Sequence, residues 1–173
     1  MKAMRTIATL LLTMLCAAAW AQDVKVDWDR AANFSGYHTY AWATGTPAKN
    51  PLMGQRIVDG VDQRLAAKGL QKVDLNSNPD LIVLYHAATG SDTQLNTFGT
   101  GWGWGWGGGS TTTTVSQIPT GQLSVDIGDA KTKKLLWLGS ASDTLSDKPE
   151  KNVQKIEKAL DKMFKKFPPP AKD

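Results

Sequence analysis

The side chains best suited to catalysis or metal binding are few in this sequence, and their spacing fits no reactive site. The only histidines are His38 and His86, and each lies within a stretch that reads as a β-strand. Zinc sites use several Cys, His or carboxylate ligands at short spacings such as H-E-x-x-H, and neither histidine belongs to such a pattern. We therefore expect both to be ordinary strand residues, and we predict no metal and no cofactor.

A serine hydrolase needs a serine, a histidine and an acid that the fold brings together. Ser140 or Ser142, combined with His86 and Asp143, would supply the three side-chain types. Many such enzymes present the serine in a G-x-S-x-G elbow, and the stretch Gly139-Ser140-Ala141-Ser142 does not match that pattern. The sequence therefore gives this activity no support.

Two pairs of aspartates could serve as the acid and base of a glycosidase, which places two carboxyl groups across a sugar ring. Asp27 and Asp29 flank Trp28, while Asp126 and Asp129 lie at the start of a turn. The first pair would face solvent from an edge strand, and aspartate is a common turn residue. We favour these structural roles, predict no catalytic residue and class the chain as a non-enzyme.

The most unusual segment is a Gly-Trp run over residues 101–109, which carries Trp102, Trp104 and Trp106. In an extended backbone alternate side chains share a face, so the three indoles would form one stripe. We favour packing on the chain's own sheet, or low-complexity disorder. The alternatives are contact with a partner protein or a lipid surface, and stacking on the sugars of an envelope glycan. These tryptophans are the candidate contact surface.

Two other interpretations of this region fail. Gly103, Gly105 and Gly108 match G-x-G-x-x-G, but that dinucleotide fingerprint must be followed by a helix, and here a strand-prone Thr tract follows. Binding of single-stranded nucleic acid would pair aromatic with basic side chains, yet no Lys or Arg occurs between Ala87 and Asp129. We predict no nucleic acid partner.

The first 21 residues have the organisation of a secretory signal peptide. Lys2 and Arg5 give a basic start, residues 7–15 are mostly apolar, and Ala19-Trp20-Ala21 fits an A-x-A cleavage site. We predict cleavage after Ala21 and a mature chain that begins at Gln22. The apolar stretch is too short for a good transmembrane helix, and we predict none in the mature chain.

Cys16 is the only cysteine and lies within the predicted signal peptide. A lipoprotein would be acylated on this residue, but Leu15 stands where such proteins normally have a small residue. We favour soluble export over a lipid anchor, which places the protein in the periplasm or cell envelope of a bacterium, with outer-membrane association left open. Loss of Lys2 and Arg5 lowers the net charge from +4 to about +2.

The remaining basic residues gather at the C-terminus, where a helical pattern carries Lys148, Lys151, Lys155, Lys158, Lys162, Lys165 and Lys166. Such a cluster could touch anionic lipid or glycan. We favour the solvated face of an amphipathic helix, because Glu150, Glu157 and Asp161 are interleaved with the lysines.

Hydrophobic periodicity predicts the elements of the mature chain. Strands are expected at 24–28, 37–42, 81–87, 122–127 and 135–138, and helices at 52–68 and 150–167. The continuous apolar run 81–87 predicts a central strand buried on both faces. The stretches 122–127 and 135–138 form the clearest hairpin. Asp147 and Glu150 resemble a capping box at the start of the last helix.

This order predicts an α+β fold, an antiparallel sheet with two amphipathic helices packed on one face. We expect a single domain over residues 22–173, with a Gly/Trp/Thr-rich ribbon or loop at about 90–120.

Several of these stretches resemble the bacterial domain of unknown function family 4136. The most specific are Gly121-Gln122-Leu123-Ser124-Val125-Asp126-Ile127 and the stretch 129–137 that ends in Trp137. Val26-Asp27-Trp28, Tyr40-Ala41-Trp42 and Pro79-Asp80-Leu81 are similar to earlier parts of the family pattern. The resemblance implies an exported envelope domain, often lipid-anchored, with no assigned activity or catalytic residues.

Together these observations predict a non-enzymatic structural or protein-interaction module of the cell envelope. The alternative is a protein that binds glycan or a small ligand through the Gly-Trp stripe. The expected partner is an envelope protein, a lipid surface or a glycan.

Overall fold

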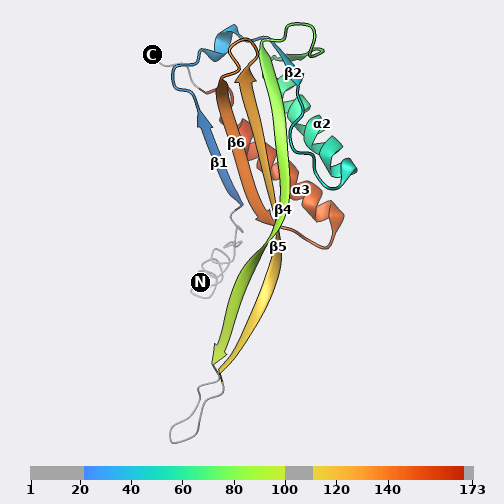
Figure 1. The fold of residues 1–173 in the computed structure, drawn as a ribbon, viewed down its shortest axis with the longest axis vertical. Coiled ribbons are helices and arrows are strands. Elements are labelled where there is room, and N and C mark those ends of the chain that lie inside the picture. Colours follow the sequence, from blue (N-terminus) through green and yellow to red (C-terminus); the bar gives the residue numbers. More distant parts are fainter. Residues whose placement is uncertain (1–21, 100–110, 170–173) are drawn as a thin grey trace, which may run out of the picture.

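The computed structural model describes residues 22–99 and 111–169. The elements follow the chain in this order: β1 (Asp23–Trp28), the short 3-10 helix η1 (Phe34–Gly36), β2 (Thr39–Trp42), α2 (Pro51–Ala67), β3 (Gln71–Lys72), β4 (Leu81–Gly99), β5 (Thr111–Asp129), β6 (Leu135–Thr144) and α3 (Pro149–Phe164). Figure 1 shows both helices on one face of the sheet, as predicted, and the fold is of the α+β class.

The sheet has six strands in the order β1-β6-β5-β4-β2-β3. β2 runs parallel to β3 and to β4, whereas the other neighbouring pairs are antiparallel. The prediction of a purely antiparallel sheet was therefore wrong. The cause is α2, which carries the chain back across the sheet after β2, so that β3 starts from the same end.

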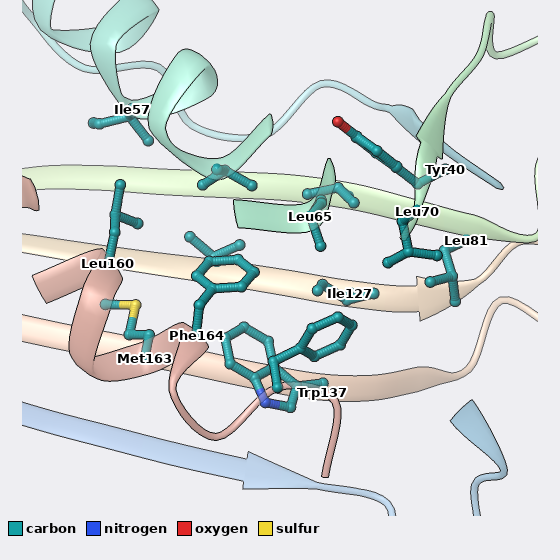
Figure 2. Packing of buried hydrophobic residues seen from close by; sticks show 14 of the residues in the cluster. Tyr40, Ile57, Leu65, Leu70, Leu81, Ile127, Trp137, Leu160, Met163 and Phe164 are labelled. Carbon is teal, nitrogen blue, oxygen red and sulfur yellow. The ribbon is translucent and has the colours of Figure 1, made fainter. Parts of the chain in front are cut away.

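The core lies between the sheet and the helices (Figure 2), and Trp137 on β6 is its largest fully buried side chain. Its ring centroid lies 5.3 Å from that of Phe164 and 5.4 Å from that of Phe167. Gly139 makes room for this packing, because a Cβ there would lie 2.5 Å from Trp137 Cη2 and 3.1 Å from Met163 Sδ. The tryptophan of the predicted hairpin thus anchors α3 on the sheet.

Local sequence explains where the helices begin and end. The Asn50 side chain accepts hydrogen bonds from the amides of Leu52 and Met53 at the start of α2. The helix ends at Ala67, and Gly69, whose φ of 84° suits glycine, lies just after it. The predicted capping box of α3 was wrong, because its N-cap is Lys148 and makes no side-chain cap bond.

Ser146 and Asn152 stabilise the entry to α3 instead. The Asn152 amide donates to the carbonyl of Ser146 at 2.8 Å, and its oxygen accepts from the Ser146 amide at 2.8 Å. The helix itself ends at Phe164, before the predicted limit, although Phe167 remains buried in the core.

Two polar clusters connect the helices with their neighbours. Arg64 on α2 donates to Glu157 Oε2 at 2.8 Å and to Asp161 Oδ1 at 2.6 Å, both on α3. Asp62 Oδ1 accepts from the Tyr40 hydroxyl and from Trp42 Nε1, each at 2.7 Å. Burial, and then the bond to Asp62, raise the pKa of Tyr40 far above its usual range.

β4 is central in the sheet, as predicted, but only one of its faces is fully buried. Leu81 and Val83 are buried under the helices, whereas Ile82 and Leu84 are half-buried on the other face. We call the face without helices the outer face. Because the outer face is partly exposed, β4 alternates between buried and half-buried side chains, although its continuous apolar sequence predicted burial on both faces. Among the described residues, neither helix combines the length and apolar character needed to cross a membrane.

Candidate functional site

The strands β4 and β5 extend well beyond the rest of the sheet. They remain paired through nine residue pairs past the last β5–β6 pair, from Ser91↔Pro119 to Gly99↔Thr111. Within the described part of the chain, no third strand pairs with either of them there. We call residues 91–99 and 111–119 the ribbon, and the rest of the described structure the body. Figure 1 shows the ribbon projecting away from the body.

The ribbon presents a nearly uncharged surface at its base. Asp92 is the only charged residue between Ser91 and Pro119. The side chains of Asp92, Thr93 and Gln117 are exposed, and Ile118 is half-buried. Both edges of a two-stranded ribbon carry backbone N–H and C=O groups that a further strand can use.

A cleft of about 320 Å³ lies at the base of the ribbon, between the starts of α2 and α3 and the sheet strands. Its walls are mainly aliphatic and include Ala48, Met53, Ile57, Leu123, Ala141, Leu145, Ile156 and Ala159. Gly121 also lines it, where β5 passes from the ribbon into the body. The cleft is therefore an apolar site built from five elements that are distant in sequence.

Several polar groups on the wall of the cleft are engaged by neighbouring residues. Lys155 Nζ lies 3.0 Å from Asp143 Oδ1 and 2.6 Å from the carbonyl oxygen of Thr144. The amide of Gln22 donates to the Lys155 carbonyl at 2.8 Å. Lys49, at the mouth, is exposed and forms no ion pair with any residue that the structure describes. Positive charge is thus available at the entrance.

The outer face carries a row of polar residues across several strands. Register places His86 beside Ser124, Ser124 beside Ser140, and Ser140 beside Lys25. The Thr46 amide donates to His86 Nδ1 at 3.1 Å, so the proton of the neutral imidazole is on Nε2. That nitrogen lies 3.9 Å from Asp126 Oδ2, and the other oxygen of Asp126 is buried with no hydrogen-bond partner among the described residues.

This row is not the hydrolase site considered from the sequence. His86 faces outward, whereas Asp143 binds Lys155 of α3, so the fold does not bring this acid to the imidazole. Ser140 and Ser142 lie near His86 on the outer face, but no hydrogen bond joins either of them to the imidazole in the described structure.

The two histidines have separate surroundings. The amide of His38 donates to Asp80 Oδ2 at 2.9 Å at the start of β2, away from His86. Bonds from the amides of His38 and Thr39 hold the pKa of Asp80 below its usual value. Within residues 22–99 and 111–169, no three His, Cys, Asp or Glu side chains lie together as metal ligands would.

Asp129 is the last residue of β5, and its side chain binds the turn that follows. It accepts hydrogen bonds from the amides of Thr132 and Lys131 and from the Tyr37 hydroxyl. The Thr132 amide contributes most to holding the pKa of Asp129 below its usual range. Asp126 lies three residues earlier on β5 and faces His86 on the outer face, whereas Asp129 binds the turn and Tyr37. The two carboxyl groups therefore have separate partners and do not form a glycosidase pair.

The other sequence candidates also have structural roles where they can be placed. Asp27 lies on the edge strand β1 and binds its neighbour's amide, while Asp29 binds Lys134. Most of the C-terminal lysines are exposed, and Lys155 is the exception at the cleft. Trp102, Trp104, Trp106, Cys16 and Ala21 lie outside the described residues, so the predicted contact stripe, lipidation and cleavage sites have no structural account.

Sequence reasoning missed the cleft, and it left open whether the region at about 90–120 is a ribbon or a loop. The cleft is lined by mainly aliphatic residues from five elements, and no local pattern marks such a site. The Thr tract after residue 110 was a weak signal for the ribbon, because threonine favours strands.

Comparison with known protein families gives a match over most of the chain, the ribbon included. The family model described as Domain of unknown function (DUF4136) matches residues 24–169. Comparison with curated proteins gives no match.

Two solved structures share the fold. A PDZ domain protein from Parabacteroides distasonis ATCC 8503 is 15% identical with a TM-score of 0.57, and the match covers 85% of this chain and 35% of that one. This chain therefore spans about a third of the length of that protein. A DUF4136 family protein from Bacteroides thetaiotaomicron VPI-5482 is 16% identical with a TM-score of 0.51, covering 85% of this chain and 96% of that one. At these identities the likeness concerns the fold alone.

Proposed function

The chain belongs to the DUF4136 family, whose model matches residues 24–169, and we propose that it is a non-enzymatic module of the bacterial cell envelope that contacts a partner protein through the ribbon. The observation that carries this proposal is the ribbon itself. It extends through nine residue pairs, from Ser91↔Pro119 to Gly99↔Thr111, without a third strand or a covering helix in the described structure.

A projecting two-stranded ribbon suits contact better than self-stabilisation. An isolated hairpin is at best marginally stable in water, and none of the ribbon side chains whose burial is described, at 91–93 and 116–119, belongs to the hydrophobic core. Natural proteins usually protect free strand edges with charges, yet Asp92 is the only charged residue in this stretch. A partner that adds a strand to one edge would use the free backbone groups directly.

The absence of a reactive constellation in the described structure supports a role other than catalysis. His86 engages Thr46 and faces Asp126, and no serine completes a relay with it. The envelope location rests on the signal-like segment 1–21 of the sequence. Mass spectrometry of the mature protein tests it: we expect an N-terminus at Gln22, and a diacylglyceryl group on Cys16 would replace soluble export by a lipid anchor.

Site-specific photo-crosslinking in the native bacterium tests the contact. A photoreactive residue at Thr93 or Gln117, which are paired and exposed on the ribbon, should give a discrete adduct with one protein. The matched control is the same residue at Gln63, which is exposed on α2. Adducts of the same kind and yield at Gln63, or none at the ribbon, would contradict the proposal.

The tryptophan stripe gives the alternative its own test. Replacement of Trp102, Trp104 and Trp106 by Ala should abolish binding to isolated envelope glycan if the chain is a glycan-binding protein. If the ribbon contacts a protein, glycan binding is absent from the unmodified chain as well, and the crosslinked adduct at Thr93 identifies the partner.

A further inference from the structure

We propose that the cleft at the base of the ribbon binds the hydrocarbon chain of a single-chain anionic amphiphile, such as a long-chain fatty acid, with the head group at Lys49. This site is separate from the ribbon contact of the proposed function.

The size and lining of the cleft fit one aliphatic chain. Its volume of about 320 Å³ is near the lower end of the range for small-molecule sites, about 300–1,000 Å³. Aliphatic side chains such as Met53, Leu123 and Ile156 form its walls, and no aromatic side chain lines it among residues 22–99 and 111–169. A sugar or flat aromatic ligand would find no ring on which to stack. A flexible hydrocarbon chain gains from contact with every wall.

The state of the polar groups argues against a peptide as the occupant. Lys155 already binds Asp143 and Thr144, and Asn152 both donates to and accepts from Ser146. A peptide backbone placed against these engaged groups would bury N–H and C=O groups without partners, which is unfavourable. A hydrocarbon chain has no such groups, so it can fill the cleft without disturbing the bonds around it.

The charge at the entrance selects an anionic head group. Lys49 and Lys155 line the cleft together with a single acid, Asp143, which is paired with Lys155. The N-cap of α2, Asn50, and the first residue of α3, Pro149, also line it, so the positive ends of both helices lie at this site. Lys49 has no ion-pair partner in the described structure and can receive a carboxylate.

Displacement of a fluorescent fatty acid from the full-length mature protein tests the proposal. Fatty acids of 8 to 16 carbons form the series, and each two added carbons should tighten binding about ten-fold until the cleft is filled. The alcohol of the same length should bind more weakly than the acid. Lys49→Gln should remove that preference while leaving the affinity for the alcohol unchanged.

Two filling variants locate the site. Ala141→Leu places three more carbons inside the cleft and should weaken binding of the longest acids at least ten-fold. Ala48→Leu, on the loop before α2, does the same nearer the mouth and remains informative if Ala141→Leu fails to fold. Ala66→Leu, an equal change at an exposed position of α2, is the matched control and should bind as the unmodified protein does.

Three results would overturn the inference. They are affinity that does not depend on chain length, equal affinity of acid and alcohol in the unmodified protein, and equal weakening by Ala66→Leu and the filling variants. None of these results changes the crosslinking expected at Thr93, so the two proposals can fail separately.

Discussion

The body and the ribbon share the strands β4 and β5 but differ in what holds them. In the body, Val83 and Ile127 are neighbours on these strands and are fully buried beneath the helices. In the ribbon, β4 and β5 pair with each other and with no other described strand, and the described side chains at its base are exposed or half-buried. The comparison shows that pairing alone extends a strand, whereas burial determines how much each residue contributes to stability.

The largest effect is expected in the aromatic centre of the body. Trp137→Ala should lower the free energy of unfolding by about 3–5 kcal/mol, because it leaves a cavity between Phe164 and Phe167. Urea unfolding followed by circular dichroism measures this loss. Trp137→Phe should cost less than half as much, since it keeps a ring and removes an indole N–H that has no acceptor among the described residues. A loss below 1 kcal/mol for Trp137→Ala would contradict the assigned core.

The next effect concerns Asp62, a half-buried acceptor of the body. Asp62→Ala removes the acceptor for the Tyr40 hydroxyl and Trp42 Nε1, and it should cost about 2 kcal/mol because a buried donor loses its partner. Asp59→Ala, on the exposed side of the same helix, is the control and should cost less than about 0.5 kcal/mol. Urea unfolding measures both losses of unfolding free energy. Equal losses would show that the hydrogen bonds of Asp62 to Tyr40 and Trp42 do not stabilise the fold.

A smaller effect should appear only in acid. The folded pKa of Asp80 lies below its ordinary value of 3.8, mainly through the amides of His38 and Thr39. Its contribution to stability is therefore complete above that value and is lost as the pH falls through the folded pKa. The difference in unfolding free energy between the unmodified chain and Asp80→Asn should be constant near neutral pH and shrink below about pH 4. A difference that stays unchanged down to about pH 2.5 would contradict this assignment.

The smallest effect is expected in the ribbon. Thr93→Ala and Gln117→Ala should each change the free energy of unfolding by less than about 0.5 kcal/mol, because both side chains are exposed. Thermal unfolding of the two variants beside the unmodified chain provides the measurement. A loss above 1 kcal/mol would mean that the ribbon is part of the stabilising core, and it would remove the contrast with the body.

Periodic burial made much of the body predictable. The helix α2 follows its expected range, because one side of it packs on the core. The hairpin of β5 and β6 lies where it was expected, although both strands extend beyond the predicted 122–127 and 135–138. The parallel part of the sheet could not be predicted from pattern. β3 has only two residues, Gln71 and Lys72, both exposed, and so has no hydrophobic alternation.

The candidate sites were predictable to a smaller extent. Residues 91–99 and 111–119 are rich in Thr, Ser and Gln, and without a core to face they show no apolar alternation that would mark long strands. The cleft is lined in part by Ala48, Ala141 and Ala159, which are far apart in sequence. Small side chains are equally suited to tight packing and to lining a space, so only the assembled fold distinguishes the two.

The unbroken register from Leu81↔Asp129 to Gly99↔Thr111 also has a mechanical consequence. A load applied along the ribbon reaches the body in shear, so that many backbone hydrogen bonds share it at once. The antiparallel pairing keeps the two strands from sliding independently, and the ribbon therefore acts as a lever whose base passes beside Gly121 at the cleft.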